Sequence, residues 1–277
     1  MVYRIVCDSC TDLPLELAAD PQVKKVPLSI HIGSETIIDD ENFCQDALLR
    51  KMRAWPDAPK TACPAPSMFL DRFLEEGDTY VVTLSGQLSG SYNAAMQARA
   101  IYLEDGGRGN VHVFNSRSAA SGQALIAMRI RELAGRGLPF VQVVEQVETY
   151  ISQMKTLFVL ENLDNLRKNG RLTRMQALVT GALHVKLLCG STPEGDIQKL
   201  GQGLTMKQTL ARMVCRMEAD AAHAGRRLML AQCNCPERAE ALRELIRKRC
   251  CFGEILIVPT GGISTVYADD GGIVAAY

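Results

Sequence analysis

The sequence predicts a two-domain α/β protein, on three observations. Short apolar runs alternate with segments of helical periodicity, which is typical of a parallel sheet covered by helices. The chain has 277 residues, enough for two ordinary domains. Apolar residues make up 47% and charged residues 22%, as in an average globular protein. We expect an N-terminal domain with a parallel sheet in α/β/α layers over residues 1–155, and a second α/β domain over residues 156–277.

In the first half of the chain, we expect a strand wherever a short apolar run is bounded by turn residues. Such runs lie at 2–7, 79–84 and 111–114, and the second has the continuous apolar character of a buried parallel strand. Segment 23–32 contains Pro27 and predicts an edge or bent strand, because proline cannot donate a ladder hydrogen bond. Helical spacing or alanine-rich composition predicts helices at 47–52, 67–74, 93–103, 119–133 and 139–154.

The same sequence patterns predict the helices and strands of the second half. Long helical patterns occupy 205–222 and 239–248. We expect no helix or strand in the polar stretch 161–174 or in the glycine-rich stretch 181–203. Strands are expected at 156–160, 227–232, 255–259 and 272–277.

Charge and hydropathy exclude several classes of protein. Lys+Arg and Asp+Glu number 31 each, so the chain has no basic excess with which to bind nucleic acid. Its apolar runs fall short of the ~20 residues that span a bilayer, so we expect no stable membrane insertion. The N-terminal residues do not resemble a signal peptide. Ten cysteines in such a chain favour reduced thiols and a cytoplasmic location.

The most informative segment is 83–93, which follows a buried strand and opens a helix. Ligands bind at this edge of an α/β sheet, and free backbone N–H groups beside the Ser85, Ser89 and Ser91 hydroxyls suit a carboxylate or phosphate. The simpler alternative is a turn in which Ser89 or Ser91 caps the helix. The segment lacks the Gly-Lys-Ser/Thr of a phosphate-binding P-loop. It is not a nucleophile elbow, because Gln87 and Ser91 flank Ser89 where that motif needs glycines.

A second polar segment, 61–67, also precedes a helix. Thr61 or Ser67 offers a hydroxyl to a bound anion. On the residues alone, a rigid proline turn with Ser67 as the helix cap is the favoured interpretation.

The basic turn at 165–173 carries Arg171. By its residues it is an exposed turn with Thr173 as a helix cap, and a role in binding a partner needs support from elsewhere.

Catalytic alternatives rest on cysteine, histidine and aspartate. Cys7 and Cys10 form a C-x-x-C, but the residues after it predict a loop rather than the helix that would activate a thiol. No second pair at suitable spacing completes a zinc site. His112 and His184 lie among apolar residues and are expected in the core or at its edge, and Asp39 is expected in a solvated turn. An acyl-ester serine hydrolase and a thiol redox enzyme remain the alternative functions.

The order and spacing of these motifs resemble the DegV family of bacterial fatty acid-binding proteins, which includes the binding subunits of fatty acid kinase. The resemblance runs over most of the chain and is strongest over residues 1–175. It is carried by Cys7-Asp8-Ser9, Asp12-Leu13-Pro14, Val26-Pro27-Leu28, Asp39, Thr61-x-x-Pro64, Ser85-x-x-Leu88-Ser89-Gly90-Ser91-Tyr92 and Leu163-x-x-Leu166-Arg167-Lys168-x-Gly170-Arg171-Leu172.

The resemblance implies a single long acyl chain, such as palmitate or oleate, in an apolar tunnel between two α/β domains. It implies no catalysis by this chain and no cofactor, but a kinase partner that phosphorylates the bound carboxylate, with Arg171 near that interface. Thr61 and Ser89 match the family's carboxylate-binding motifs and are the first expected contacts. The accompanying positions are Ala62 and Gly86, which each replace a family serine, together with Ser85, Gly90 and Ser91.

The C-terminal part departs from the family pattern. Tyr267 stands where the family has the histidine of a His-Thr-Gly-Pro-Gly segment, and 268–271 replaces the rest. An arginine-rich stretch of the family is here 200–205, which has no arginine. The Tyr267 hydroxyl can still donate to a carboxylate, so we expect it to bind the ligand in place of histidine.

Overall fold

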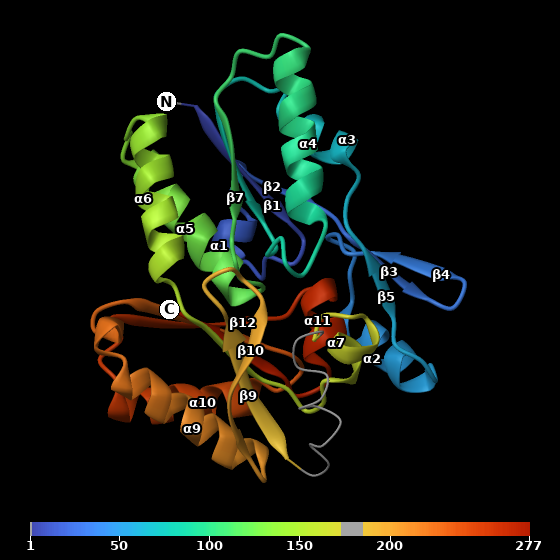
Figure 1. Ribbon diagram of the computed structural model, residues 1–277, viewed down its shortest axis with the longest axis vertical. Coiled ribbons are helices and arrows are strands. Elements are labelled where there is room, and N and C mark those ends of the chain that lie inside the picture. Colours follow the sequence, from blue (N-terminus) through green and yellow to red (C-terminus); the bar gives the residue numbers. More distant parts are fainter. Residues whose placement is uncertain (1, 173–184) are drawn as a thin grey trace.

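The computed structural model describes residues 2–172 and 185–277 and has the predicted α/β architecture (Figure 1). Two of the sequence-based expectations, Thr173 as a helix cap and His184 in the core, lie outside the described residues. Among the described residues, no helix combines the length and apolar character needed to cross a membrane.

The N-terminal sheet is fully parallel, with strand order β2-β1-β6-β7. Ile5 packs toward one face of this sheet and Val6 toward the other, as the alternation of side chains along a strand requires. The strands are β1 (Tyr3–Asp8), β2 (Val23–Val26), β6 (Asp78–Thr83) and β7 (Val111–Asn115). The helices of this half are α1 (Leu15–Ala18), α3 (Pro66–Leu70), α4 (Ser91–Glu104), α5 (Ser121–Gly135) and α6 (Phe140–Gln153).

The second sheet has six strands in the order β10-β9-β8-β13-β11-β12, of which only β11 and β12 run parallel. Its strands are β8 (Thr156–Val159), β9 (Lys186–Ser191), β10 (Ile197–Gly203), β11 (Arg227–Gln232), β12 (Glu254–Pro259) and β13 (Ile273–Ala276). One face packs on α9 (Met206–Ala219) and α10 (Pro236–Arg249), with the 3₁₀ helix η2 (Ala221–His223) after α9.

The β9–β10 hairpin occupies a region to which the sequence assigned no element. Two glycines in β10 and a register shift between Lys199 and Gly201 interrupt the alternation by which a strand is recognised.

Helix α5 lies between the two sheets and contacts β1 and β6 of the first and β11 and β13 of the second. One apolar cluster therefore includes Ile5 and Tyr80 from the first sheet and Met229 and Ala276 from the second. The two sheets are held together by a shared core. The chain passes from the first to the second between α6 and β8, close to the expected boundary at 155, and the division into two domains stays a prediction.

A small antiparallel sheet of order β4-β3-β5 projects from the side of the molecule (Figure 1). The expected strand 23–32 is divided at Pro27 into β2 and β3, which belong to different sheets. Segment 61–67 is only partly a loop, since Thr61 pairs with Ile30 inside β5. The elements here are β3 (Ser29–Ile32), β4 (Glu35–Ile38), β5 (Lys60–Ala62) and α2 (Gln45–Ala54).

Two short helices that the sequence did not predict lie side by side near the middle of the molecule (Figure 1). They are α7 (Asp164–Lys168) and α11 (Gly262–Ala268), joined by a hydrogen bond of 2.8 Å from Asn165 Nδ2 to the Val266 carbonyl oxygen. Both are too short for a helical pattern to stand out in sequence. They position one end of the candidate site.

Candidate functional site

A cavity of about 310 Å³ lies where the loops that follow β6 and β7 meet β5, β8, α7 and α11. Its walls are predominantly apolar, with only a few polar groups, the composition typical of a site for a small apolar ligand. Apolar residues on the wall include Leu84, Leu88, Phe158, Leu160, Ile263 and Val274.

Polar groups gather at one end of the cavity. Thr61 Oγ1 and Tyr267 Oη lie 2.7 Å apart and share a hydrogen bond. The guanidinium of Arg171 lies 5.7 Å from the centre of the Tyr267 ring, within cation–π range. Arg171 is fixed there by hydrogen bonds to the carbonyl oxygens of Leu88, at 3.2 Å, and of Asn169. One of the two hydroxyl hydrogens is used in the bond between Thr61 and Tyr267, so this end of the cavity offers the other hydroxyl hydrogen and a positive charge to an anion.

The Tyr267 phenol remains protonated near neutral pH. Burial raises its pKa above the usual value, and the hydrogen bond it shares with Thr61 and the charge of Arg171 only partly offset this. Tyr267 therefore acts as a neutral donor, unlike a histidine, which would gain charge as the pH falls.

The serine loop reaches the cavity through Ser89 and Gly90, opposite Ala62 and Cys63. Ser89 Oγ accepts a hydrogen bond of 3.2 Å from the Ser91 backbone N–H. Among the described residues, no acceptor takes the Ser89 hydroxyl hydrogen. A Cβ at position 90 would lie only 3.0 Å from Cys63 Sγ, so a larger residue there would require the Cys63 side chain to move.

Three predicted contacts are not on the cavity wall. The loop coils into a turn, and the Ser85 hydroxyl donates to the Gly195 carbonyl oxygen at 2.7 Å. The Ser91 hydroxyl donates to Asp8 Oδ2 at 2.6 Å, and Gly86 N–H donates to the Asn115 side chain at 3.2 Å. Ser85 and Ser91 are fully buried. These residues shape the loop that presents Ser89, and their expected contact with a ligand has no support from this arrangement.

The structure gives Arg171 a position the sequence did not foresee. The family resemblance implies a position near a partner interface, which stays a prediction, and the structure puts its side chain on the cavity wall against Tyr267. The two residues are distant in the chain, so no local pattern could bring them together.

A second polar group lies elsewhere on the cavity wall. Ser118 Oγ and Thr156 Oγ1 are 2.6 Å apart, and both side chains are buried. Arg117 and Ser191 lie beside them on the wall. No motif marks this group in the sequence, although alternation along β8 puts Thr156 on the same face as Phe158.

The N-terminus of α11 is held by two buried carboxylates. Asp39 accepts hydrogen bonds from Gly262 N–H at 2.8 Å and Ile263 N–H at 3.0 Å, and Asp12 accepts one from Gly261 N–H at 2.8 Å. The expectation of a solvated turn was therefore wrong for Asp39, which is 4% exposed. Burial raises the pKa of Asp12 to about 7 and also raises that of Asp39.

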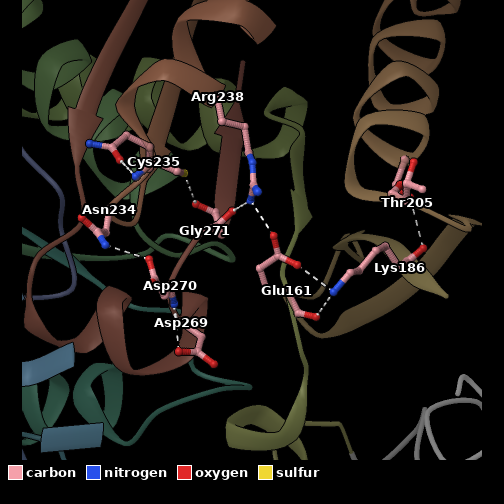
Figure 2. A network of polar contacts seen from close by, with 12 residues as sticks. Glu161, Lys186, Thr205, Asn234, Cys235, Arg238, Asp269, Asp270 and Gly271 are labelled. Atoms are coloured by element: carbon pink, nitrogen blue, oxygen red, sulfur yellow. Dashed lines mark hydrogen bonds and ion pairs between the residues drawn. The ribbon is translucent and has the colours of Figure 1, made fainter. Parts of the chain in front are cut away.

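The loop after α11 is held by a polar network (Figure 2). Asn234 Nδ2 donates to Asp270 Oδ1 at 2.8 Å. Arg238 donates to the Gly271 carbonyl oxygen and pairs with Glu161 at 2.8 Å. These contacts connect the loop to β11, α10 and the residues after β8, so both ends of the helix that carries Tyr267 are fixed.

The thiol alternative finds no support in this arrangement. Cys7 and Cys10 are buried and free, and burial raises the pKa of both thiols, that of Cys7 to about 12. A thiol of such high pKa is a poor nucleophile near neutral pH.

A serine hydrolase needs a base beside its nucleophile. Of the histidines that the structure describes, none lies on the cavity wall. His31 contacts Ser29 and Thr36, His112 pairs with Glu148, and His223 contacts Asp220 and Cys251.

Comparison with known proteins matches residues 3–277 to the model of an uncharacterised protein family named DegV. A DegV domain-containing protein of Streptococcus gordonii is 33% identical over 279 residues, covering 100% of this chain and 99% of its own.

Two solved structures are similar over 100% of this chain and 99% of theirs. The crystal structure of a DegV family protein from Ruminococcus gnavus, refined with vaccenic acid, has a TM-score of 0.96 and 43% identity. The Streptococcus pneumoniae Fatty Acid Kinase (Fak) B3 protein, loaded with linoleic acid, has a TM-score of 0.92 and 33% identity.

Proposed function

The chain belongs to the DegV family, and on that premise we propose that it binds one long-chain fatty acid. The acyl chain occupies the apolar cavity, and the carboxylate lies at the end formed by Thr61, Tyr267 and Arg171, with Ser89 beside it. Burial of the chain contributes about 0.8 kcal/mol per CH₂ group. Each hydrogen bond to the carboxylate adds roughly 1–3 kcal/mol and sets the orientation of the ligand.

One observation carries this proposal: an apolar cavity has a hydroxyl pair and an arginine at one end. That distribution complements an amphiphile with one anionic group. The ligands named for the Ruminococcus gnavus and Streptococcus pneumoniae proteins, vaccenic and linoleic acid, are molecules of this kind.

In this proposal the chain binds its ligand without a cofactor and performs no chemistry by itself. The pneumococcal relative is named as a fatty acid kinase protein, which favours a kinase that acts on the acid this chain presents. Ten free thiols suit a cytoplasmic location, where cysteines stay reduced.

Native mass spectrometry of the protein as purified from a bacterial host tests the binding function. We expect one adduct per chain with the mass of a long-chain fatty acid. Ala119→Phe, which puts a ring on the cavity wall, should abolish the adduct, whereas Ala222→Phe on the exposed helix η2 should keep it. A lipid-free protein that also fails to bind added palmitate or oleate would rule out the proposal.

The kinase role needs a separate assay. A purified fatty acid kinase catalytic subunit with ATP should convert the bound acid to an acyl phosphate when this chain is present and leave free acid unchanged. Binding without any phosphate transfer would retain the binding function and remove the kinase role.

A further inference from the structure

We propose that the cavity selects long-chain acids that carry a hydroxyl group toward the methyl end, and that Thr156 recognises that hydroxyl. This inference rests on the proposed function, because it assumes that the carboxylate lies at the Thr61–Tyr267 end. It concerns the substrate class of the same site.

Strand β8 shows that Thr156 lies far from the carboxylate end. Thr156 and Phe158 alternate along it, Leu160 follows directly after its end, and all three line the cavity. The chain continues from Leu160 into α7, which packs on the helix that carries Tyr267. Four residues of extended chain span about 13 Å, so Thr156 faces the part of an acyl chain that is distant from its carboxylate.

The hydroxyl of Thr156 has an unused hydrogen-bonding capacity. It shares one hydrogen bond of 2.6 Å with Ser118 Oγ, and Ser118 Oγ also lies 3.4 Å from the Ala119 carbonyl oxygen. If Ser118 donates to Thr156, the Thr156 hydrogen has no acceptor among the described residues. If Thr156 donates, its oxygen accepts nothing. A ligand hydroxyl is both donor and acceptor, so it completes either arrangement.

The surroundings of Thr156 are also more polar than the stretch of wall at Phe158 and Leu160. A second cavity, of about 490 Å³, shares Arg117, Thr156 and Ser191 with the first. An alkyl tail that ended here would bury the hydroxyl and leave its remaining hydrogen-bonding capacity without a partner, which is unfavourable. A ligand hydroxyl at mid-chain, beside Phe158, would in contrast be buried without a hydrogen-bond partner.

Competition binding with octadecanoic acid and its monohydroxy isomers tests the inference on the unaltered protein. Isomers share the same composition, so only the position of the hydroxyl differs. We expect isomers with the hydroxyl near the methyl end to bind roughly 3- to 10-fold more tightly than mid-chain isomers, the effect of one net hydrogen bond. Equal affinities across the series, or a preference for mid-chain isomers, would overturn the inference.

Thr156→Val, which keeps the shape of the side chain, should abolish the preference while octadecanoic acid itself still binds. Ser264→Ala removes a different hydroxyl from the cavity wall, on α11, and should keep the preference. If Thr156→Val still prefers isomers with the hydroxyl near the methyl end, a group other than Thr156 recognises that hydroxyl. A dicarboxylic acid that binds more tightly than the best hydroxy acid would also contradict the inference, by assigning recognition to the charge of Arg117.

These outcomes separate the inference from the proposed function. If octadecanoic acid binds without any preference among its isomers, the inference fails and the binding function stands. If none of the acids binds, the proposed function itself fails.

Discussion

The Thr61 hydroxyl lies 2.7 Å from the Tyr267 hydroxyl, a contact between β5 and α11 across 206 residues of sequence. Thr61 comes from the small antiparallel sheet and Tyr267 from a helix fixed at both ends. Two rigid parts of the fold therefore meet at one end of the apolar cavity, and their hydroxyls are oriented without a ligand's help. Such preorganised donors favour an anion at this point.

Removing the Tyr267 hydroxyl should weaken binding without preventing it. We expect Tyr267→Phe to reduce affinity for a long-chain fatty acid by about 1 kcal/mol, the usual net value of one hydrogen bond. The loss should be the same at pH 6 and pH 8, because the phenol stays neutral over that range. Titration calorimetry checks this, with Tyr102→Phe, away from the cavity, as the control. Unchanged affinity would place the carboxylate elsewhere.

Loss of the Arg171 charge should have a larger effect. Arg171→Met should weaken binding by roughly 1.5–3 kcal/mol, the range for a hydrogen bond to a charged group. Arg167→Met on α7 is the matched control, since that arginine pairs with Asp164 and does not line the cavity. The same calorimetric titration measures both variants. Equal affinities in the two would show that Arg171 has only a structural role.

Two serines of one loop should behave differently. Ser89→Ala should reduce affinity for the fatty acid and lower the free energy of unfolding only slightly, through loss of its part-buried hydrogen bond of 3.2 Å to the Ser91 N–H. Ser85→Ala should lower the free energy of unfolding by roughly 1–3 kcal/mol, because it leaves the buried Gly195 carbonyl oxygen without its donor. Chemical denaturation of the ligand-free protein and a binding titration separate the two effects. The reverse pattern would mean that the loop presents Ser85 to the ligand.

Asp12 should make the protein less stable as pH rises. Its folded-state pKa of about 7 exceeds the unfolded value of ~3.9, so the folded state binds more protons between these values. The free energy of unfolding should therefore fall as pH rises through this window and level off above it. Asp12→Asn should make the decline between pH 5 and pH 8 smaller in urea denaturation. Asp105→Asn, at an exposed site, should leave it unchanged, and an unaltered decline in Asp12→Asn would refute the assignment.

The sequence predicted the parts of the fold that rest on local pattern. The parallel strands around Ile5 and Val81 are continuous apolar runs, and α5 and α9 are long enough for their periodicity to show. The β9–β10 hairpin was missed because its glycines break the alternation.

For the candidate site too, the sequence predicted the residues that belong to local motifs but not the contacts between distant segments. Thr61, Ser89 and Tyr267 stand on the cavity wall, as the family motifs led us to expect. Arg171 against Tyr267 and Ser118 against Thr156 are contacts between distant segments, which a single sequence does not encode in any local pattern.

The position of the bound carboxylate tests the central claim most directly. A crystal structure of the protein saturated with palmitate should show one acid per chain, its carboxylate within hydrogen-bonding distance of Thr61 Oγ1 and Tyr267 Oη and its chain along β8 toward Thr156. An acid bound outside the cavity, or one whose carboxylate lies at the Thr156 end, would contradict the account.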